Sequence, residues 1–221
     1  MIPVSVLVVA KAPVPGLAKT RLAAGVGDDV AADLAAAALL DTLDAVTDSP
    51  VAARVVALTG NLDHARRATE ICSRLADFVV LQQRGDDFAG RLANAHLDAA
   101  AATGGLPILQ IGMDTPQVNP ELIGRCARAL AGNDAVLGMA SDGGWWVLGV
   151  RHAATADCLR GVPMSAADTG TATLAALQHA GVAVELVSEL TDVDTLDDVD
   201  LVRRACLPGS RFSRVAAQVS A

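Results

Sequence analysis

A loop with several basic side chains follows the first apolar run, in the stretch AKAPVPGLAKTRL at residues 10–22. Its Lys-Thr pair looks like the end of a P-loop, but alanines stand at 12 and 18, where that motif needs glycine, and the prolines at 13 and 15 cannot donate a backbone N–H. Lys11, Lys19 and Arg21 could instead converge on a polyphosphate through their own charges, with Gly16 permitting a tight turn. The alternative is a solvated basic turn.

Carboxylates follow two later apolar runs. Asp114 lies in QIGMDTP (110–116), and Asp192 and Asp194 lie in LTDVDTLDDVD (190–200). Carboxylate oxygens are suitable ligands for a hard divalent cation, which these three residues could share if the fold brings them together. Alternatively, Asp114 is a turn or cap residue. Capping by Thr195 explains the acidic residues at 197 and 198, but it requires neither Asp192 nor Asp194.

A third segment, SDGGWWVLG (141–149), combines Asp142 with two glycines and the only two tryptophans of the sequence. The glycines allow the backbone to approach a ligand closely. Trp145 and Trp146 point to opposite faces of a strand, so one is expected in the core while the other could flank a pocket. A tight hairpin with core aromatics is the simpler explanation of the tryptophan pair.

These segments sit between short apolar runs that alternate with alanine-rich, helix-like stretches. Most of the apolar runs lack a polar face, as strands covered on both sides do, so the pattern predicts an α/β fold with a mostly parallel sheet. In such sheets ligands bind beyond the carboxyl ends of the strands, where these segments fall. The expected strands cover 4–10, 53–60, 77–83, 106–112, 134–140, 145–150 and 182–188. The expected helices cover 28–48, 61–75, 87–103, 119–131, 168–180 and 195–206, with Asp28, Asn61 and Asn119 opening the first, second and fourth.

One pair of expected strands, 134–140 and 145–150, is too close in sequence for a helical crossover. These two strands cannot be parallel neighbours, so the sheet must be mixed, with at least one antiparallel strand. Neither a repeat nor a linker divides the chain. We therefore expect a single domain over residues 1–206 and a peripheral tail at 207–221.

Composition narrows the class of protein. The net charge of −8 argues against a nucleic-acid partner, and no apolar run reaches the roughly 20 residues of a membrane span. The apolar N-terminal run is interpreted as a buried strand rather than a secretory leader, since no basic segment precedes it. Four cysteines lie far apart, without metal-site spacing. Together these features predict a cytoplasmic protein with reduced cysteines.

Taken in order, five segments resemble the bacterial family called domain of unknown function 2064. They are AKAPVPGLAKTRL, QQRGDDFAGRLANAH (82–96), IGMDTPQVNPELI (111–123), SDGGWWVLGV (141–150) and DVDTLDDV (192–199). The family belongs to the nucleotide-diphospho-sugar transferase superfamily and is often labelled as glycosyltransferases. The resemblance thus implies a three-layer α/β/α fold of the GT-A type. The first loop and Asp114-Thr115-Pro116 are also similar to cofactor guanylyltransferases.

The resemblance also implies roles for individual residues. Lys19 and Arg21 would bind phosphate, and Asp114 with Asp192 or Asp194 would bind Mg²⁺ or Mn²⁺. The remaining expected ligand contacts are Lys11, Gly16, Gly90 and Arg91 near the nucleotide, with Asp142 and Gly143 facing the second substrate. Two positions depart from the family pattern, in which cysteine is common at Thr115 and tryptophan at Met164; the second departure leaves the acceptor open.

The function expected from the resemblance is a metal-dependent glycosyl transfer from a nucleotide-diphospho-sugar to an acceptor, with Lys19, Arg21 and Asp114 as the catalytic residues. Two alternatives stay open. The first is guanylyl-type nucleotidylyl transfer from a nucleoside triphosphate to a phosphorylated or small acceptor, which the basic first loop favours because a triphosphate carries more charge. The second is a non-catalytic nucleotide-binding protein with the same fold.

Overall fold

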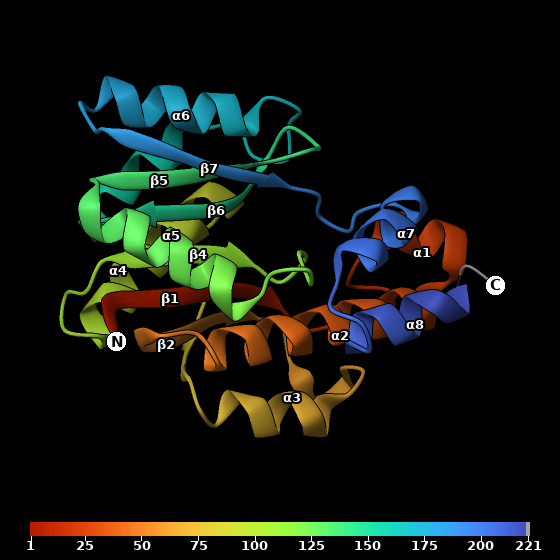
Figure 1. Ribbon diagram of the computed structural model, residues 1–221. Coiled ribbons are helices and arrows are strands. Elements are labelled where there is room, and N and C mark those ends of the chain that lie inside the picture. Colours follow the sequence, from red (N-terminus) through yellow and green to blue (C-terminus); the bar gives the residue numbers. More distant parts are fainter. Residues whose placement is uncertain (220–221) are drawn as a thin grey trace.

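The structure is a computed structural model that describes residues 1–219, which form one seven-stranded sheet with helices on both faces (Figure 1). The strands are β1 (Ile2–Lys11), β2 (Val51–Thr59), β3 (Val79–Gln82), β4 (Ile108–Gly112), β5 (Ala135–Ala140), β6 (Trp145–Val150) and β7 (Val184–Leu190). The helices are α1 (Thr20–Val26), α2 (Asp28–Thr47), α3 (Ala68–Leu75), α4 (Phe88–Ala102), α5 (Pro120–Gly132), α6 (Thr169–His179), α7 (Leu196–Ala205) and α8 (Arg211–Val219), with 3-10 segments η1 (Leu62–His64) and η2 (Ala153–Gly161).

The strand order is β3-β2-β1-β4-β6-β5-β7, and β6 runs antiparallel to both of its neighbours. The other neighbouring strands pair in parallel. The expected mixed, mostly parallel α/β sheet is thereby confirmed. Because β6 alone among these strands is reversed, the carboxyl ends of β1, β4, β5 and β7 reach one edge of the sheet, together with the β5–β6 turn.

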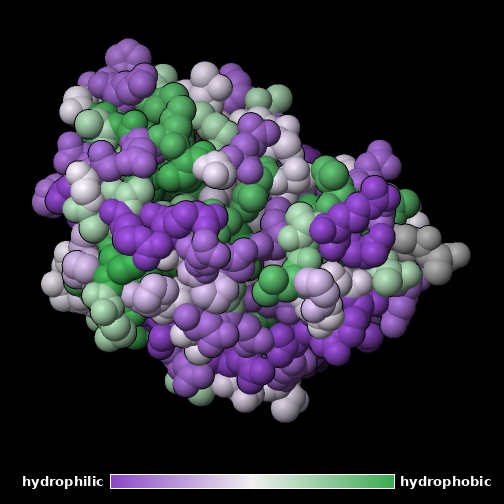
Figure 2. Space-filling model, viewed as in Figure 1, coloured by the Kyte–Doolittle hydropathy of each residue, from purple (hydrophilic) through white to green (hydrophobic). Residues whose placement is uncertain are grey.

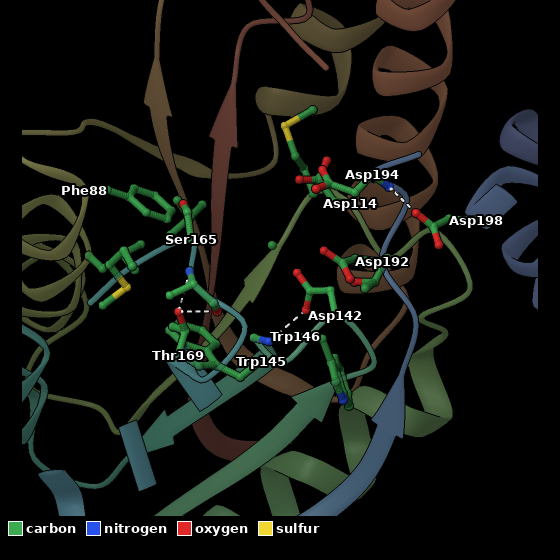
Figure 3. A pocket seen from close by; sticks show the side chains of 18 of the residues that line it. Phe88, Asp114, Asp142, Trp145, Trp146, Ser165, Thr169, Asp192, Asp194 and Asp198 are labelled. Carbon is green, nitrogen blue, oxygen red and sulfur yellow. Dashed lines mark hydrogen bonds between the residues drawn. The ribbon is translucent and has the colours of Figure 1, made fainter. Parts of the chain in front are cut away.

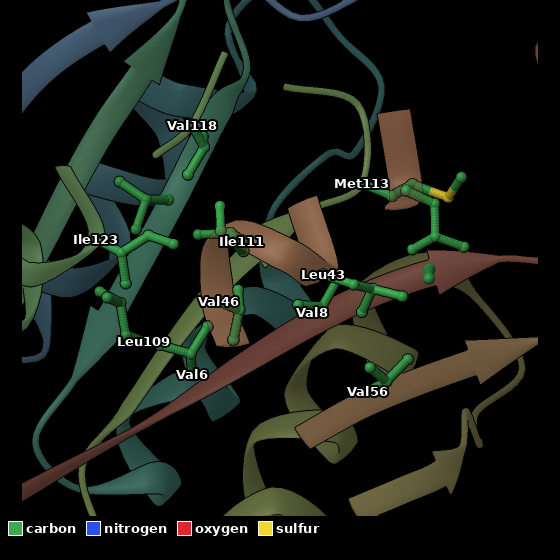
Figure 4. Packing of buried hydrophobic residues seen from close by; sticks show 14 of the residues in the cluster. Val6, Val8, Leu43, Val46, Val56, Leu109, Ile111, Met113, Val118 and Ile123 are labelled. Carbon is green, nitrogen blue, oxygen red and sulfur yellow. The ribbon is translucent and has the colours of Figure 1, made fainter. Parts of the chain in front are cut away.

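The sheet is the middle one of three layers. Helices α2, α3 and α5 cover one face, and α4, α6 and η2 cover the other. Alternation along β1 explains how one strand serves both layers, because Val6 and Val8 belong to one apolar core while Leu7 belongs to the core on the opposite face. Figure 4 shows the first of these cores, in which Val8 lies close to Leu43 of α2.

A second group of helices lies beyond the carboxyl edge of the strands. Helices α1, α7 and α8 pack with the first half of α2 around a separate apolar cluster that contains Leu22, Leu34, Val199 and Phe212. We call α1, α7 and α8 the helical lobe. Figure 1 shows the lobe to one side of the sheet, facing the ends of the strands.

The C-terminal segment differs from the peripheral tail that we expected at 207–221. Residues 211–219 form α8, and Phe212 is completely buried in the lobe. The first residue of α8, Arg211, forms ion pairs with Asp44 (2.6 Å), Glu70 (2.7 Å) and Asp41 (3.3 Å). The sequence gives only a weak sign of this packing, because only a few apolar side chains, spaced for a single helix face, anchor the segment to α2.

Several element boundaries also differ from the expectations. The helix expected at 61–75 is divided into η1 and α3 at Arg67, whose φ of 56° does not fit an α-helix. Helix α1 and η2 were not foreseen. Asn61 and Asn119 act as N-caps, whereas Asp28 is the first residue of α2 and Gly27 holds the cap position.

The face of the molecule that Figure 2 shows is mostly polar. Apolar side chains gather on this face over β5 and β7, where Leu186 is 56% exposed. Within residues 1–219, no helix combines the length and apolar character that crossing a bilayer requires.

The burial of α8 generates a stability prediction. Phe212→Ala is expected to lower the free energy of unfolding by about 3–5 kcal/mol, because it leaves a cavity in the lobe. Urea denaturation followed by circular dichroism measures this change. Leu207→Ala, at a side chain that is 60% exposed, is the control and should change the free energy by less than about 0.5 kcal/mol. An equally small effect of Phe212→Ala would show that α8 is not part of the cooperative fold.

Candidate functional site

Four loops meet between the carboxyl edge of the sheet and the helical lobe. They follow β1, β4, β5 and β7, and they bring Arg21, Asp114, Asp142, Asp192 and Asp194 to one cleft of about 680 Å³. A smaller groove of about 390 Å³ adjoins the cleft and shares Arg21, Asp114 and Asp194 with it. The sheet topology thus gathers residues that lie up to 173 positions apart in the sequence.

Lys19 occupies the centre of the contact between the first loop and the carboxylates. Its Nζ lies 3.0 Å from Oδ1 of Asp114 and 3.6 Å from Oδ1 of Asp194, and it donates a hydrogen bond to the carbonyl of Val193. The backbone of Lys19 is left-handed, with φ 51° and ψ 47°, just before α1 begins. A lysine in this rarely populated conformation indicates that its surroundings fix the direction of the side chain.

Arg21 completes the cationic side of the site. Its Nη1 lies 2.7 Å from Oδ2 of Asp194, while its side chain is 68% exposed. Asp194 therefore holds both cations of the first loop, and Arg21 stays accessible from the cleft. The loop after β7 is fixed in turn by Asp198, whose carboxylate accepts hydrogen bonds from the backbone N–H and the hydroxyl of Thr195. This is the cap that the sequence predicts at the start of α7.

The loops after β4 and β7 are joined by their backbones. The N–H of Val193 donates to the carbonyl of Asp114 at 2.9 Å, and the side-chain amide of Gln117 donates to the carbonyl of Thr191. Asp114 and Asp192 are consequently held on the same side of the cleft. Figure 3 shows both carboxylates there, next to Asp142 and Asp194.

Asp192 differs electrostatically from its neighbours. Partial burial raises the pKa of its carboxyl to about 6, and the nearby negative charge of Asp142 adds to this shift, as that of Asp114 does more weakly. Its backbone hydrogen bond and Lys19 act in the opposite direction. No ion pair involves Asp192 in the described part of the chain. A carboxylate in such a position is a natural partner for an added cation.

The β5–β6 turn places Asp142 at the cleft. Its Oδ1 accepts a hydrogen bond from the N–H of Gly144 at 2.8 Å. Gly143 has φ 91°, and a Cβ there would come within 1.8 Å of the carbonyl oxygen of Ala167, so only glycine fits this position. The glycine pair therefore shapes the turn and lets the segment before α6 lie directly against it.

The opposite part of the cleft is apolar. Phe88, Leu92, Trp145 and Met164 line it, and the buried Gln110 of β4 also contributes to the lining. Figure 3 shows Phe88 and Trp145 on one side of the cleft and the carboxylates on the other. We refer to these two regions as the apolar half and the acidic half.

Behind the cleft lies His96, a fully buried residue of α4. Burial lowers its pKa to about 4, against a smaller opposing effect of Gln110, so the ring is neutral at physiological pH. Neither ring nitrogen makes a hydrogen bond of good geometry. His96 therefore belongs to the packing beneath the site.

The site residues that the sequence predicts fall into two groups in the structure, those that line the cleft or the groove and those that do not. Lys19, Arg21, Asp114, Asp142, Asp192 and Asp194 line the cleft or the groove, and Lys11 lines the groove. Gly16, Gly90, Arg91 and Gly143 line neither of these cavities. The N–H of Gly90 is already bound by the N-cap Asp87 at 2.6 Å, and Arg91 stacks 5.7 Å from the centre of the Phe88 ring.

Sequence reasoning missed the contribution of α4. Phe88 lies beside Gly90 and Arg91 in the nominated segment and is 42% exposed, yet its aromatic ring is what reaches the cleft. The scarcity of aromatic residues could have indicated this contribution. The chain has only three phenylalanines and two tryptophans, so each of them was a candidate for a specific role in the core or in a ligand site.

A divalent cation fits the acidic half by the type of its donors, which are hard carboxylate oxygens. Among residues 1–219, no three acidic, histidine or cysteine side chains are close enough to surround one ion. Magnesium commonly needs only one or two carboxylates, because waters and substrate phosphates complete its octahedron. Asp192 makes no ion pair in the described part of the chain, whereas Lys19 contacts Asp114, and both Lys19 and Arg21 contact Asp194. A cation held by Asp114 and Asp192 would therefore compete with a single lysine.

Comparison with known proteins agrees with this architecture. A family model described as an uncharacterized protein conserved in bacteria (DUF2064) matches residues 42–166, a range that includes Asp114 and Asp142. A search of curated protein sequences gives no match. Among solved structures, a Desulfovibrio desulfuricans protein assigned as a nucleotide-diphospho-sugar transferase is 25% identical with a TM-score of 0.82, and 99% of each chain is covered.

More distant structures share the fold. A nucleotidyl transferase from Methanothermobacter is 19% identical with a TM-score of 0.58, covering 96% of this chain and 98% of its own. A manganese complex of Rv0371c from Mycobacterium tuberculosis is also 19% identical, with a TM-score of 0.54 and coverage of 90% and 97%. The fold is therefore one that nucleotide-using transferases share, and one structural relative binds manganese.

The raised pKa of Asp192 predicts a pH-dependent effect of Asp192→Asn. In the wild type, protonated Asp192 stabilises the fold at low pH, and this contribution is lost as the pH rises through about 6. In EDTA, the variant should therefore melt at a higher temperature than the wild type at pH 8 and at nearly the same temperature at pH 4. Scanning calorimetry at both pH values measures this, with Asp77→Asn as an exposed control. Equal melting temperatures at pH 8 would contradict the electrostatic description.

The contacts of Lys19 predict how the protein responds to added metal. Lys19→Met removes the ammonium between Asp114 and Asp194, and without metal it should cost on the order of 1 kcal/mol of stability. Mn²⁺ should then raise the melting temperature more in the variant than in the wild type, because the carboxylates have lost their internal cation. Arg125→Met, which removes an exposed cation of α5 that pairs with Glu121, provides the control. If Mn²⁺ raised the melting temperatures of Lys19→Met and the wild type equally, Lys19 would not compete with a cation for these carboxylates.

Proposed function

The chain belongs to the DUF2064 family, and we propose that it is a metal-dependent transferase that moves a glycosyl group from a nucleotide-diphospho-sugar to an acceptor. The observation that carries the proposal is the contact of Lys19 and Arg21 with carboxylates from the other end of the chain. Phosphate-binding cations and cation-binding carboxylates thus meet at the edge of the sheet where α/β proteins bind ligands. The likeness to the Desulfovibrio protein gives this proposal further support.

In this proposal the diphosphate binds between the first loop and the acidic half. Lys19 exchanges its contacts with Asp114 and Asp194 for contacts with phosphate oxygens, and Arg21 exchanges its contact with Asp194 in the same way and can bind in a bidentate manner. Asp114 and Asp192 hold Mg²⁺ or Mn²⁺, which when bound offsets the negative charge of the diphosphate. Lys11, in the adjoining groove, adds a third positive charge.

The transfer breaks the bond between the anomeric carbon and the diphosphate, and an acceptor oxygen forms the new bond to that carbon. Negative charge develops on the departing phosphate oxygen, where Lys19 and Arg21 are placed to stabilise it. Asp142, on the β5–β6 turn, faces the acceptor, and its carboxylate is positioned to accept the proton that the acceptor's hydroxyl releases. Positioning and electrostatics supply most of the acceleration in such a mechanism.

Nucleotidylyl transfer is the second candidate, and one observation favours it. Lys11, Lys19 and Arg21 all line the groove beside the cleft, and three cations suit a triphosphate better than a diphosphate. The fold shared with the Methanothermobacter nucleotidyl transferase is compatible with this reaction. The two reactions differ in the released product, which is a nucleoside diphosphate in the first and pyrophosphate in the second.

A ligand panel tests the proposal. Nucleotide-sugars and nucleoside triphosphates are added with Mg²⁺ or with EDTA, and a ligand at about 100 times its Kd should stabilise the fold by about 2.7 kcal/mol. Stabilisation is expected with metal and should be lost in EDTA. Binding that survives EDTA without turnover would instead indicate a non-catalytic nucleotide-binding protein, and no stabilisation by any nucleotide would contradict all three functions.

Once a substrate is found, Lys19→Ala, Arg21→Ala and Asp114→Asn should each lower kcat/KM by about 100-fold, equivalent to about 3 kcal/mol of transition-state stabilisation. Arg125→Ala, which breaks only an exposed ion pair with Glu121 on α5, is the control and should keep full activity. Unchanged turnover in Lys19→Ala and Asp114→Asn would refute the assignment of the site.

A further inference from the structure

We infer that the acceptor carries an aromatic or aliphatic group, and that this group binds in the apolar half of the cleft. This inference rests on the proposed function, because it assigns the second substrate of the same cleft. The donor's phosphates are expected beside Lys19 and Arg21, in the acidic half and the adjoining groove. The side chains of the apolar half, Phe88, Leu92, Trp145 and Met164, carry no charge that could bind phosphate, and we assign this half to the acceptor rather than to the donor's base.

The distribution of aromatic side chains is the first observation behind this inference. The chain contains only three phenylalanines, two tryptophans and no tyrosine. Phe88, Trp145 and Trp146 line this one cleft, so three of the five aromatic residues are found there. Trp146 is buried and contributes to the core, whereas Phe88 and Trp145 keep part of their surface accessible.

Phe88 has the geometry of a preformed contact surface. It is the first residue of α4, and the capping hydrogen bond from the N–H of Gly90 to Asp87 fixes this end of the helix. The guanidinium of Arg91 stacks against the ring at 5.7 Å. Phe88 is nevertheless 42% exposed at the cleft that it lines. A carbon-rich ligand group would cover it.

The polar groups around the apolar half are mostly engaged already. The hydroxyl of Thr169 bonds to the carbonyls of Pro163 and Ala166, and the indole N–H of Trp145 donates to Thr173 at 3.2 Å. A fully hydroxylated sugar would find few partners here, and each buried hydroxyl without a partner weakens binding by about tenfold. Within residues 1–219, two groups are exceptions: the buried amide oxygen of Gln110 makes no hydrogen bond, and the exposed hydroxyl of Ser165 is also free. A ligand with an apolar body and few hydroxyls fits these walls best.

The test uses 4-fluorophenol as the probe, with binding followed by ¹⁹F NMR on the full-length protein. Wild type should bind the probe both with Mg²⁺ and in EDTA, because the apolar half contains no metal ligand. Phe88→Ala and Met164→Ala should each weaken binding by at least about fivefold. Leu186→Ala, which removes an exposed leucine on β7, should leave it unchanged. Far-ultraviolet circular dichroism verifies that each variant is folded.

Two results would overturn the inference. One is absence of probe binding, or equal binding by wild type, Phe88→Ala and Met164→Ala. The other is displacement of the probe by uridine or guanosine, which would place the donor's base in the apolar half instead. Failure of the proposed function would look different, because nucleotides with Mg²⁺ would then fail to stabilise the protein whatever the result with 4-fluorophenol.

Discussion

The ammonium group of Lys19 is the contact on which the arrangement of the cleft depends. It links the first loop to Asp114 after β4 and to Asp194 and the Val193 carbonyl after β7, so three distant segments share one positive charge. Without that charge, the carboxylates of the acidic half would repel one another at close range. The left-handed backbone of Lys19 is the conformational cost of this placement.

The antiparallel strand β6 helps to form the cleft in which this contact lies. Because β6 enters between β4 and β5, the short turn at Asp142 reaches the same edge as the loops that follow parallel strands. A fully parallel sheet would need a helical crossover at this point, which would replace the tight turn that now faces the acidic half. The positions of Asp142 in the acidic half and of Trp145 in the apolar half are therefore consequences of one topological feature.

The amino-acid sequence predicted the sheet well because strands buried on both faces leave continuous apolar runs, as in β1 and β4. It also located the loops after β1, β4, β5 and β7, since their polar residues interrupt those runs. It did not reveal that Lys19 contacts Asp194, because such a pairing depends on tertiary structure.

Two differences from the expectations have local physical causes. Gly90 and Arg91, predicted to lie near the nucleotide, do not line the cleft, because the cap made by Asp87 engages the N–H of Gly90 and Phe88 presents its ring there. Helix α8 was missed because its burial relies on Phe212 and on the ion pairs of Arg211, and a short polar segment gives little indication of either.

Helix α2 has a further consequence for the protein's evolution and engineering. Leu34 belongs to the core of the helical lobe, while Leu40 and Leu43 belong to the core under the sheet. This 20-residue rod, about 30 Å long, therefore sets the spacing between the two walls of the cleft although none of its residues lines it. Substitutions midway along α2 offer a route to ligands of different size that leaves the reacting groups unaltered.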